Sequence, residues 1–410
     1  MAADLAARGL VRVDADRSAD LYIINTCTVT HRADRDCRYL ARKARRENPA
    51  AKIVLAGCYV ETDREGVAAL EGVDAVIGND EKNTIADLLA QRLPELFEGA
   101  APPDSTTAAL SDFHARNRAW IKVSDGCDQH CSYCLVTIVR GPLRCRPAAE
   151  LIREIRELAA NGYREIVLTG VNMGYYCDPA GTGVESFAQL VAAILGGVPG
   201  IRLRLSSIEP QTVTDELLGA YSEAGGRICR HWHIPLQSGS DRILRAMRRP
   251  YALDRFIERA RAARQAAEGG VIGADIIVGF PGETEEDFSA GLVLADSGLL
   301  DYLHVFSYSD RPGTLAAELP DKVGPQVIRE RVKRLKAVSR RRWQMAHERM
   351  TGQALDVICE NRLAEDGCYR AVADNYLRVK MPPGVPGGRD IYRVRLTSAA
   401  IDHAEAELVE

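Results

Sequence analysis

Six short apolar segments between residues 117 and 326 each lead into a polar or glycine-rich stretch, and helical periodicity fills the intervals between them. This alternation predicts parallel strands connected by helices, because parallel pairing requires a long crossover connection. Six strand–helix units form most of a barrel but not its eight-fold closure, and functional groups are expected at the carboxyl ends of the strands. The predicted strands are WIKVSD, EIVLTGV, IRLRLSSI, HWHIPLQ, GADIIVGF and YLHVFSYS.

Two changes of composition divide the rest of the chain. Residues 1–97 alternate apolar strands with helices, which predicts a parallel-sheet domain with its ligands at the carboxyl ends of the strands. Residues 98–116, rich in Ala, Pro, Ser and Thr, predict a linker. The barrel is expected over residues 117–349, ending in a basic helix, and residues 350–410 change to short strand-like pieces. The predicted fold class is therefore α/β with a strand-rich carboxyl-terminal domain.

The composition is typical of a soluble globular protein, with 46% apolar and 27% charged residues. No apolar stretch approaches the length of a membrane span, and the first residues are charged throughout, unlike a secretory signal. We therefore expect a cytoplasmic protein without membrane contact. Eleven cysteines, an odd number, favour metal binding over a disulfide scaffold. With a net charge of −4, a nucleic-acid partner would have to bind local basic patches.

The segment GCDQHCSYC places Cys127, Cys131 and Cys134 directly after the first barrel strand. A zinc site would pair two short cysteine units, but Cys145 and Cys177 are solitary in the sequence. Three thiolates suit an iron–sulfur cubane whose fourth iron stays open for a substrate or cofactor. The position at the mouth of the barrel fits this use, so the segment predicts an open 4Fe-4S cluster.

This C-x3-C-x2-C spacing, with Tyr133 before its last cysteine and a six-fold barrel around it, resembles the radical S-adenosylmethionine (SAM) superfamily. The resemblance implies that the open iron binds the amino and carboxylate groups of SAM. It also implies that an electron from the cluster cleaves the sulfonium and yields a 5′-deoxyadenosyl radical. An electron donor such as flavodoxin or ferredoxin is therefore expected.

Further segments resemble the methylthiotransferases, which add a methylthio group to tRNA or to a ribosomal protein. In that family the tail, here residues 350–410, is a small RNA-binding β-barrel called the TRAM domain. The segments that carry the resemblance are INTCTVT, AGCY, GCDQHCSYC, LTGVNMG, RLSSIEP, HIPLQSGS, MRRPY and DIIVGFPGETEEDF. Three others, HVFSYSDRPGT, RGPLRCR and ADNYLRVK, are most similar to the enzymes that act on N6-threonylcarbamoyladenosine beside the tRNA anticodon.

The resemblance thus implies a methylthiotransferase that modifies threonylcarbamoyladenosine in the anticodon region of tRNA. Isopentenyladenosine in tRNA and an aspartate of a ribosomal protein stay open as substrates within the same class. A non-catalytic RNA-binding iron–sulfur protein stays open as a different class. No general base is evident in the sequence, so no catalytic side chain is assigned. Separately, we expect the protein to be a monomer.

A second 4Fe-4S cluster is implied for the amino-terminal domain, where Cys27 and Cys58 match two of three ligand positions. The third position, in a Gly-Cys turn after a first strand, has no counterpart, because the chain opens within a predicted helix. We expect the native product to start upstream and to carry that cysteine. Cys37, inside a basic helix, is a poor substitute for a strand-end ligand. The alternative for Cys27 and Cys58 is two buried thiols.

Residues at the strand ends, together with Tyr133 of the cysteine segment, are the candidates for binding SAM. They are Gly170 and Asn172 for its methionine end, Ser207 and Glu209 for its polar groups, and His233 and Gln237 for the cavity wall. His233 lies on an apolar strand and equally fits a satisfied core histidine. The segment PGETEEDF is also an ordinary helix start, with Thr284 as its cap and acids in the first turn.

Two basic helices are candidates for RNA contact, against the common alternative of solvated charged faces. The second run, which precedes the tail, is the favoured one because it contains few acids. The basic residues are Arg38, Arg42, Lys43, Arg45 and Arg46 in the first helix, and Arg329, Arg331, Lys333, Arg334, Lys336, Arg340, Arg341 and Arg342 in the second.

Overall fold

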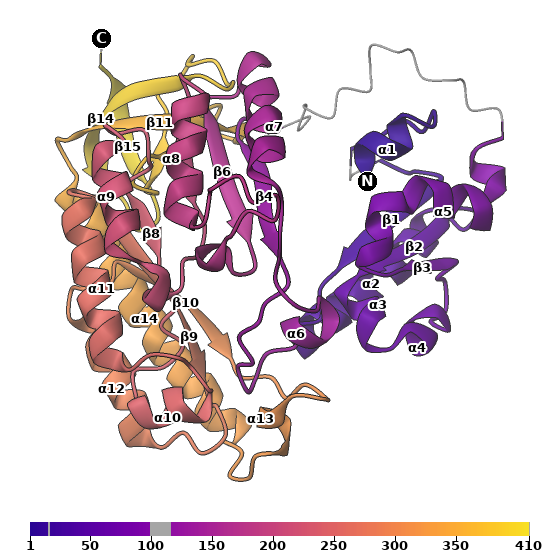
Figure 1. The fold of residues 1–410 in the computed structure, drawn as a ribbon, viewed down its shortest axis with the longest axis horizontal. Helices are drawn as coiled ribbons and strands as arrows, with labels where there is room; N and C mark the ends of the chain where they lie inside the picture. Colours follow the sequence, from indigo (N-terminus) through magenta and orange to yellow (C-terminus); the bar gives the residue numbers. More distant parts are fainter. Residues whose placement is uncertain (15–16, 99–115, 410) are drawn as a thin grey trace. The chain divides into compact units, whose positions relative to one another are not determined.

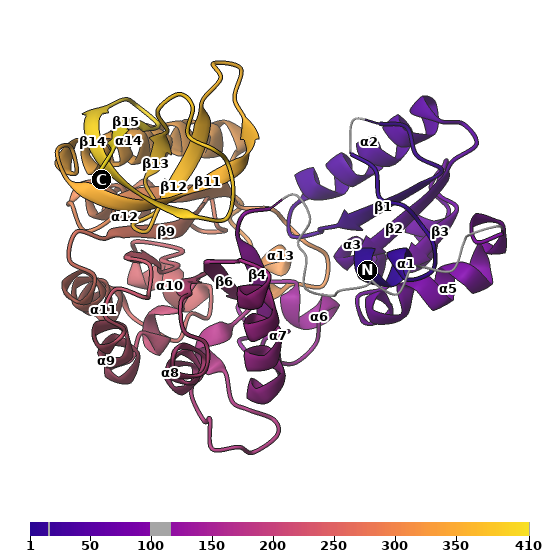
Figure 2. The same ribbon diagram turned by 90° about the horizontal axis from the view of Figure 1, so that it is seen from above.

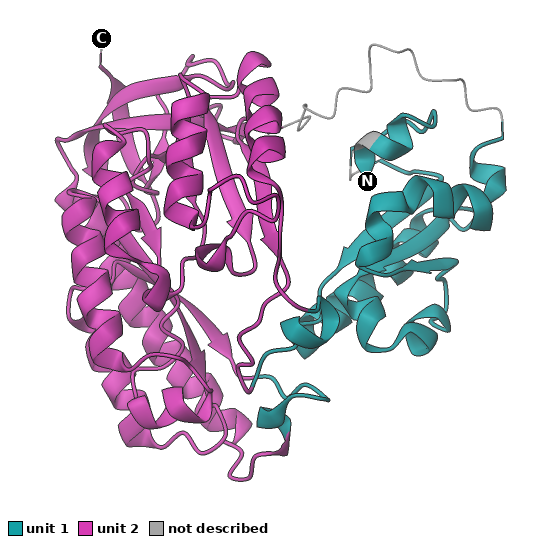
Figure 3. Ribbon diagram, viewed as in Figure 1, with its two compact units in different colours: residues 1–110, 133–141, 309–317 teal, residues 111–132, 142–308, 318–410 magenta. Residues whose placement is uncertain are grey.

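The computed structural model describes residues 1–14, 17–98 and 116–409 (Figure 1). The chain forms two compact units (Figure 3). The amino-terminal unit comprises Met1–Leu110, Tyr133–Gly141 and Ser309–Ala317, whereas the barrel unit comprises Ser111–Ser132, Pro142–Tyr308 and Glu318–Glu410. Two short segments from later in the sequence therefore belong with the first domain. The linker expected at residues 98–116 lies almost wholly outside the described residues.

A three-stranded parallel sheet in the order β1-β2-β3 is the centre of the amino-terminal unit (Figure 2). Alternate residues of β2 join different hydrophobic clusters, Ile53 and Leu55 on one face and Val54 on the other. Both faces are thus covered, which is what the continuous apolar run KIVLAG predicts. Thr26 pairs with Gly57, so the residues that follow β1 and β2 lie at one edge of the sheet. The strands are β1 (Leu21–Thr26), β2 (Lys52–Gly57) and β3 (Ala75–Ile77).

Helix α2 begins where the side chain of Thr30 accepts a hydrogen bond from the N–H of Ala33. Its first turn also holds Arg311 from the segment Ser309–Ala317, a buried residue whose guanidinium lies 2.7 Å from Asp34 and 2.6 Å from the hydroxyl of Thr28. The elements of this unit are α1 (Ala2–Ala6), α2 (His31–Glu47), α3 (Cys58–Thr62), α4 (Arg64–Ala68), α5 (Ile85–Arg92) and α6 (Val136–Val139), with the 3-10 turns η1 (Asp80–Thr84) and η2 (Pro94–Leu96).

Six parallel strands in the barrel unit form the partial barrel that the sequence predicts. β4, β6 and β7 pair in one ladder and β8, β9 and β10 in another, and isolated bridges such as Ser207 to His233 join β7 to β8. Within the described ranges no ladder joins β10 to β4, so the barrel is open along one side. The strands are β4 (Ala119–Asp125), β6 (Glu165–Gly170), β7 (Arg202–Leu205), β8 (His231–His233), β9 (Val271–Val278) and β10 (Tyr302–Ser307), with the short antiparallel β5 (Arg144–Cys145).

Helices connect these strands, and two of them test expectations from the sequence. Thr284 and Asp287 form a capping box at the start of α12, as the segment PGETEEDF predicts. In the basic helix α14, Arg331 is buried 2.7 Å from Glu283, and Arg341 lies 2.6 Å from Asp296, so both bind the barrel itself. The helices are α7 (Ala148–Ala160), α8 (Phe187–Gly197), α9 (Asp215–Glu223), α10 (Asp241–Ala246), α11 (Leu253–Ala266), α12 (Glu285–Asp296), α13 (Leu315–Glu318) and α14 (Pro325–Arg349), with the 3-10 turns η3 (Met173–Tyr175) and η4 (Pro210–Thr212).

The carboxyl-terminal strands form a closed five-stranded barrel in the order β11-β12-β13-β15-β14, which confirms the small β-barrel implied for the tail. It covers the amino ends of the larger barrel's strands: the guanidinium of Arg204 donates to the carbonyl of Ala373 over 2.8 Å, and Arg230 lies 2.6 Å from Asp374. The strands are β11 (Ala354–Leu363), β12 (Tyr369–Ala373), β13 (Arg378–Lys380), β14 (Ile391–Ala399) and β15 (Ala404–Leu408). Among the described residues, no helix is both long and apolar enough to span a membrane.

Candidate functional site

The cysteine segment begins where β4 ends, at the carboxyl edge of the barrel. The backbone turns at Gly126, whose φ of 74° favours glycine, and brings the sulfur of Cys127 beside the end of β6. That sulfur accepts hydrogen bonds from the backbone N–H of Gln129 at 3.3 Å and from the amide of Asn172 at 3.5 Å. Asn172, which follows β6, therefore contacts one of the three cysteines of the segment directly.

Cys131 is buried and has a cationic partner. The guanidinium of Arg249 donates to its sulfur over 3.2 Å and also pairs with the carboxylate of Glu209, which follows β7. Burial raises the pKa of the Cys131 thiol, and Arg249 opposes that rise because its positive charge favours the thiolate. Burial likewise raises the pKa of Glu209, and Arg249 again opposes the rise. One guanidinium thus serves a thiol and a carboxyl group together.

Cys134 belongs to the amino-terminal unit, because the chain passes from the barrel unit after Ser132. Ser132 is fixed to the barrel unit by its N–H and hydroxyl, which donate to the carbonyls of Met247 and Ala246 at 3.0 and 2.8 Å. The sulfur of Cys134 accepts a hydrogen bond from the N–H of Val136 over 3.4 Å, and half-buried Tyr133 precedes it. Each of the three sulfurs has an N–H donor, the environment that suits the thiolates of an iron–sulfur cluster.

Gly170 and Gln237, two of the candidates for binding SAM, are distinguished by their backbone positions. A methyl group at Gly170 would lie 2.6 Å from the hydroxyl of Ser124, so glycine allows the ends of β4 and β6 to approach closely. Gln237 has a φ of 63°, and its backbone pairs with β9, its carbonyl accepting from the N–H of Ile277 over 2.9 Å. Gln237 is not among the described residues that line the cavity of the barrel.

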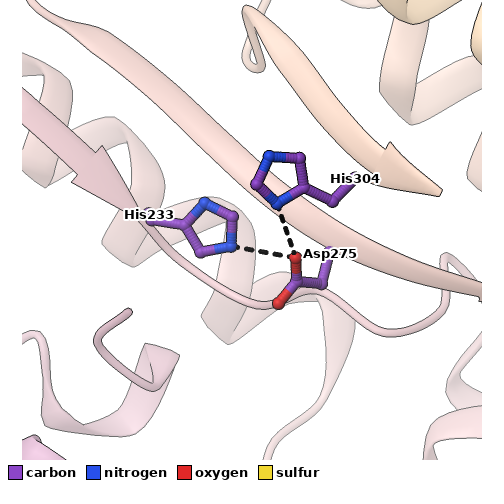
Figure 4. A group of neighbouring side chains, drawn as sticks. All are labelled: His233, Asp275 and His304. Atoms are coloured by element: carbon purple, nitrogen blue, oxygen red, sulfur yellow. Dashed lines mark hydrogen bonds and ion pairs between the residues drawn. The ribbon is translucent and has the colours of Figure 1, made fainter. Parts of the chain in front are cut away.

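A cavity of about 460 Å³ lies inside the partial barrel, and Ser207 and His233 are part of its wall. His233 is not a simple core histidine. Its Nε2 lies 3.0 Å from a carboxylate oxygen of Asp275, and Nδ1 of His304 lies 3.3 Å from the same oxygen (Figure 4). Burial alone would raise the pKa of Asp275, but its hydrogen bonds and charge interactions with the two histidines hold that pKa well below its usual range.

Sequence reasoning overlooked Asp275 and His304, although a signal existed. Asp275 interrupts the apolar run of β9, and His304 interrupts that of β10, while the register pairs the two residues directly across the strands. Polar residues at one level of adjacent parallel strands share a face. The sequence shows the two polar residues, but only the strand register shows that Asp275 and His304 are neighbours.

The amino-terminal unit has its own pair of cysteines at the edge of the sheet. Cys27 is exposed after β1, and Cys58 is buried after β2. The sulfur of Cys58 accepts from Nε of Arg140 at 3.3 Å and from the amide of Asn79 at 3.5 Å, so two N–H donors surround it, as they do the sulfurs of metal-ligating cysteines. Cys37 points from α2 to the carbonyl of Cys27 at 3.9 Å, and burial raises the pKa of its thiol.

Comparison with known proteins identifies the class. The family model of the Radical SAM superfamily matches residues 121–292, and that of Uncharacterized protein family UPF0004 matches residues 1–78. The fold is similar to that of the radical SAM methyltransferase TsrM from Kitasatospora setae, with a TM-score of 0.51, 17% identity, and coverage of 71% of this chain and 63% of that one. The matching family model, together with this fold, identifies a radical SAM protein.

Relatives then define the family. Threonylcarbamoyladenosine tRNA methylthiotransferase MtaB of Bacillus subtilis is 34% identical over 98% of this chain and 90% of its own length. MtaB of Thermotoga maritima is 36% identical over 88% and 82%. A tRNA-2-methylthio-N(6)-dimethylallyladenosine synthase of Sorangium cellulosum is 36% identical over 88% and 78%. The chain belongs to the radical SAM tRNA methylthiotransferases. It is a methylthiotransferase enzyme, and SAM and a 4Fe-4S cluster are the cofactors of its class.

Proposed function

We propose that this enzyme adds a methylthio group to N6-threonylcarbamoyladenosine beside the anticodon of tRNA. The proposal rests on the alignment with the B. subtilis MtaB protein, which extends over 98% of this chain and 90% of that protein. The dimethylallyladenosine synthase of S. cellulosum aligns over 88% and 78% at 36% identity, and that of Mycobacterium bovis covers 98% of this chain but 82% of its own length at 32% identity. The threonylcarbamoyl substrate is therefore the better supported of the two.

Cys127, Cys131 and Cys134 are the proposed ligands of the radical SAM cluster. When bound, the cluster and SAM supply an electron and a carbon-centred radical at the substrate. The chain's own contribution is to hold the sulfurs: Asn172 orients Cys127, and Arg249 offsets the charge of a buried thiolate at Cys131. Tyr133, Gly170, Ser207, Glu209, His233 and Gln237 remain the further candidates for SAM contact.

A second 4Fe-4S cluster is proposed at Cys27 and Cys58. The two cysteines follow adjacent parallel strands at one edge of the sheet, and Arg140 and Asn79 donate to Cys58. Cys37 is proposed as a structural thiol, because it is buried on a helix and bonded to a backbone carbonyl. Iron and sulfide analysis after anaerobic reconstitution tests this: about eight irons per chain supports two clusters, and about four supports only one.

The partners proposed for the enzyme are the anticodon region of tRNA and an electron donor such as flavodoxin or ferredoxin. The decisive measurement is mass spectrometry of nucleosides from tRNA of a deletion strain, with the same strain carrying the gene as its control. Loss of 2-methylthio-N6-threonylcarbamoyladenosine, restored by the wild-type gene and not by Cys131→Ala, is the expected result. Undiminished 2-methylthio-N6-threonylcarbamoyladenosine in the deletion strain refutes the proposal.

A further inference from the structure

The cavity of the partial barrel extends from the carboxyl ends of its strands to the carboxyl-terminal barrel. At one end, Thr169 and Ser207 line it, only two or three residues before Asn172 and Glu209, which contact the cysteines directly or through Arg249. At the other end, Tyr376 of the carboxyl-terminal barrel stacks on His231 with ring centroids 4.2 Å apart. The cavity is thus a recess that lies between the ends of β6 and β7 and the carboxyl-terminal barrel.

The wall of this recess is rich in cations. Arg118, Arg204 and Arg378 line it, together with the carboxylates of Asp275 and Glu360. Arg204 is already paired with the buried Glu165 at 2.8 Å, whereas Arg118 lies 3.7 Å from that same carboxylate. Since Glu165 also binds Arg202, it does not neutralise every guanidinium around it. A ligand with a carboxylate of its own suits this surface.

The wall also contains a preorganised set of hydrogen-bonding groups. Asp275 binds His233 and His304, and Nδ1 of His233 lies 3.1 Å from the hydroxyl of Tyr302, which also bonds His231 at 2.9 Å. The Tyr302 ring crosses β9 over Gly273, where a methyl group would lie 2.0 Å from the ring. These bonds fix the rings, and the half-exposed His304 keeps its Nε2 for a partner. Nε2 of the Nδ1-protonated ring accepts a hydrogen bond, such as one from an amide N–H.

We propose that this recess binds the N6 substituent of the target adenosine and selects the threonylcarbamoyl group. Arg118 and Arg378 would hold the carboxylate of its threonyl part, and His304 would accept from a carbamoyl N–H. The inference rests on the proposed function, and it assigns the specificity to named residues. A dimethylallyl group would desolvate the charged wall without making any hydrogen bond, so the same recess disfavours it.

Synthetic anticodon stem-loops carrying threonylcarbamoyladenosine, dimethylallyladenosine or adenosine test the proposal with the reconstituted holoenzyme. Arg118→Met, Arg378→Met and His304→Phe are compared with wild type and with Arg153→Met, an exposed residue of α7 outside the recess and outside both basic helices. We expect the three recess variants to lower kcat/KM for the threonylcarbamoyl RNA at least roughly ten-fold, as loss of a site built to bond a polar group does. Activity on the dimethylallyl RNA should not fall in parallel.

Two further readouts separate specificity from damage. The affinity ratio between threonylcarbamoyl and unmodified stem-loops, measured by fluorescence anisotropy, should fall in the recess variants and stay constant in Arg153→Met. Formation of 5′-deoxyadenosine without RNA should stay at the wild-type rate.

If wild type modifies the threonylcarbamoyl RNA but the recess variants keep both its rate and its affinity ratio, this inference fails and the proposed function stands. If wild type modifies only the dimethylallyl RNA, the proposed function fails as well. A divalent metal bound stoichiometrically and lost in Asp275→Asn would also overturn the inference, because the histidines would then be ligands.

Discussion

Arg249 donates a hydrogen bond to the sulfur of Cys131 over 3.2 Å while it pairs with the carboxylate of Glu209. The two contacts place a positive charge beside a buried sulfur at the carboxyl end of the barrel. Hydrogen bonds to cluster sulfurs and the charge around them set the reduction potential of an iron–sulfur centre. We therefore predict that Arg249 tunes the cluster proposed at these cysteines, although the cysteine motif does not include it.

Replacing Arg249 by methionine should shift the midpoint potential of the radical SAM cluster to a more negative value. The reason is that the variant loses a donor and a positive charge, both of which stabilise the more negative reduced state. Redox titration followed by electron paramagnetic resonance measures the shift. Arg245→Met, on the exposed side of α10, is the control and should leave the potential unchanged. An unshifted potential in an Arg249→Met protein with full iron content contradicts this role.

Glu165→Gln should destabilise the barrel unit by about 3–5 kcal/mol, because it leaves buried guanidiniums without their counter-charge. Glu165 is fully buried, 2.7 Å from Arg202 and 2.8 Å from Arg204. Thermal unfolding of the apoprotein measures the loss as a lower Tm. The matched control is Glu154→Gln, which breaks a partly exposed pair with Arg146 and should cost no more than about 1 kcal/mol. Equal Tm values for the two variants would show that the buried pair adds nothing.

The same carboxylate should give the protein an acid-sensitive component of stability. Burial alone would raise the pKa of Glu165, but the guanidiniums of Arg204 and Arg202 hold it well below its usual range. A depressed folded-state pKa stabilises fully above the unfolded value, about 4.3, and the contribution is lost as the pH falls below it. Tm is measured from neutral pH into the acid range. The Tm of the wild type should decrease once the pH is lowered past about 4.3, and the Tm of Glu165→Gln should decrease less steeply. Parallel curves for the two proteins would contradict the assignment.

Asp34→Ala should release the segment Ser309–Ala317 from the first turn of α2. It removes the acid that pairs with buried Arg311 at 2.7 Å, and an unpaired buried charge costs about 3–5 kcal/mol. Hydrogen–deuterium exchange should become faster in this segment. The control is Asp36→Ala, whose exposed carboxylate lies 3.7 Å from Arg32 and should leave the exchange unaltered. Slow exchange retained in Asp34→Ala would mean that other contacts hold the segment.

The sequence predicts those parts of the fold whose signals are local. The apolar run IVL within EIVLTGV predicts β6, because a strand buried on both faces is largely apolar. Thr284 predicts the start of α12, because a cap and its acids lie within four residues. The cysteine segment can be recognised as a candidate cluster site for the same reason, because Cys127, Cys131 and Cys134 are close together in the sequence.

The remainder depends on contacts between distant residues. Arg249 meets Cys131 across 118 positions, and Asp275 meets His304 only through the register of β9 and β10. The polar residues that interrupt β9 and β10 are visible in the sequence, but no local pattern shows that Asp275 meets His304 or that Arg249 meets Cys131. Arg331 shows the opposite effect, because a basic run suggests RNA contact until burial and Glu283 show that this residue is bound within the barrel unit.

The amino-terminal unit is assembled from three stretches of chain, the last of which ends at Ala317. A ribosome releases β1, β2 and β3 early, but Arg311 follows only after the final strand of the barrel has been synthesised. Asp34 therefore lacks its partner during most of translation. The first domain can therefore be completed only late in translation, after a segment some 280 residues downstream of the start of α2 has been synthesised.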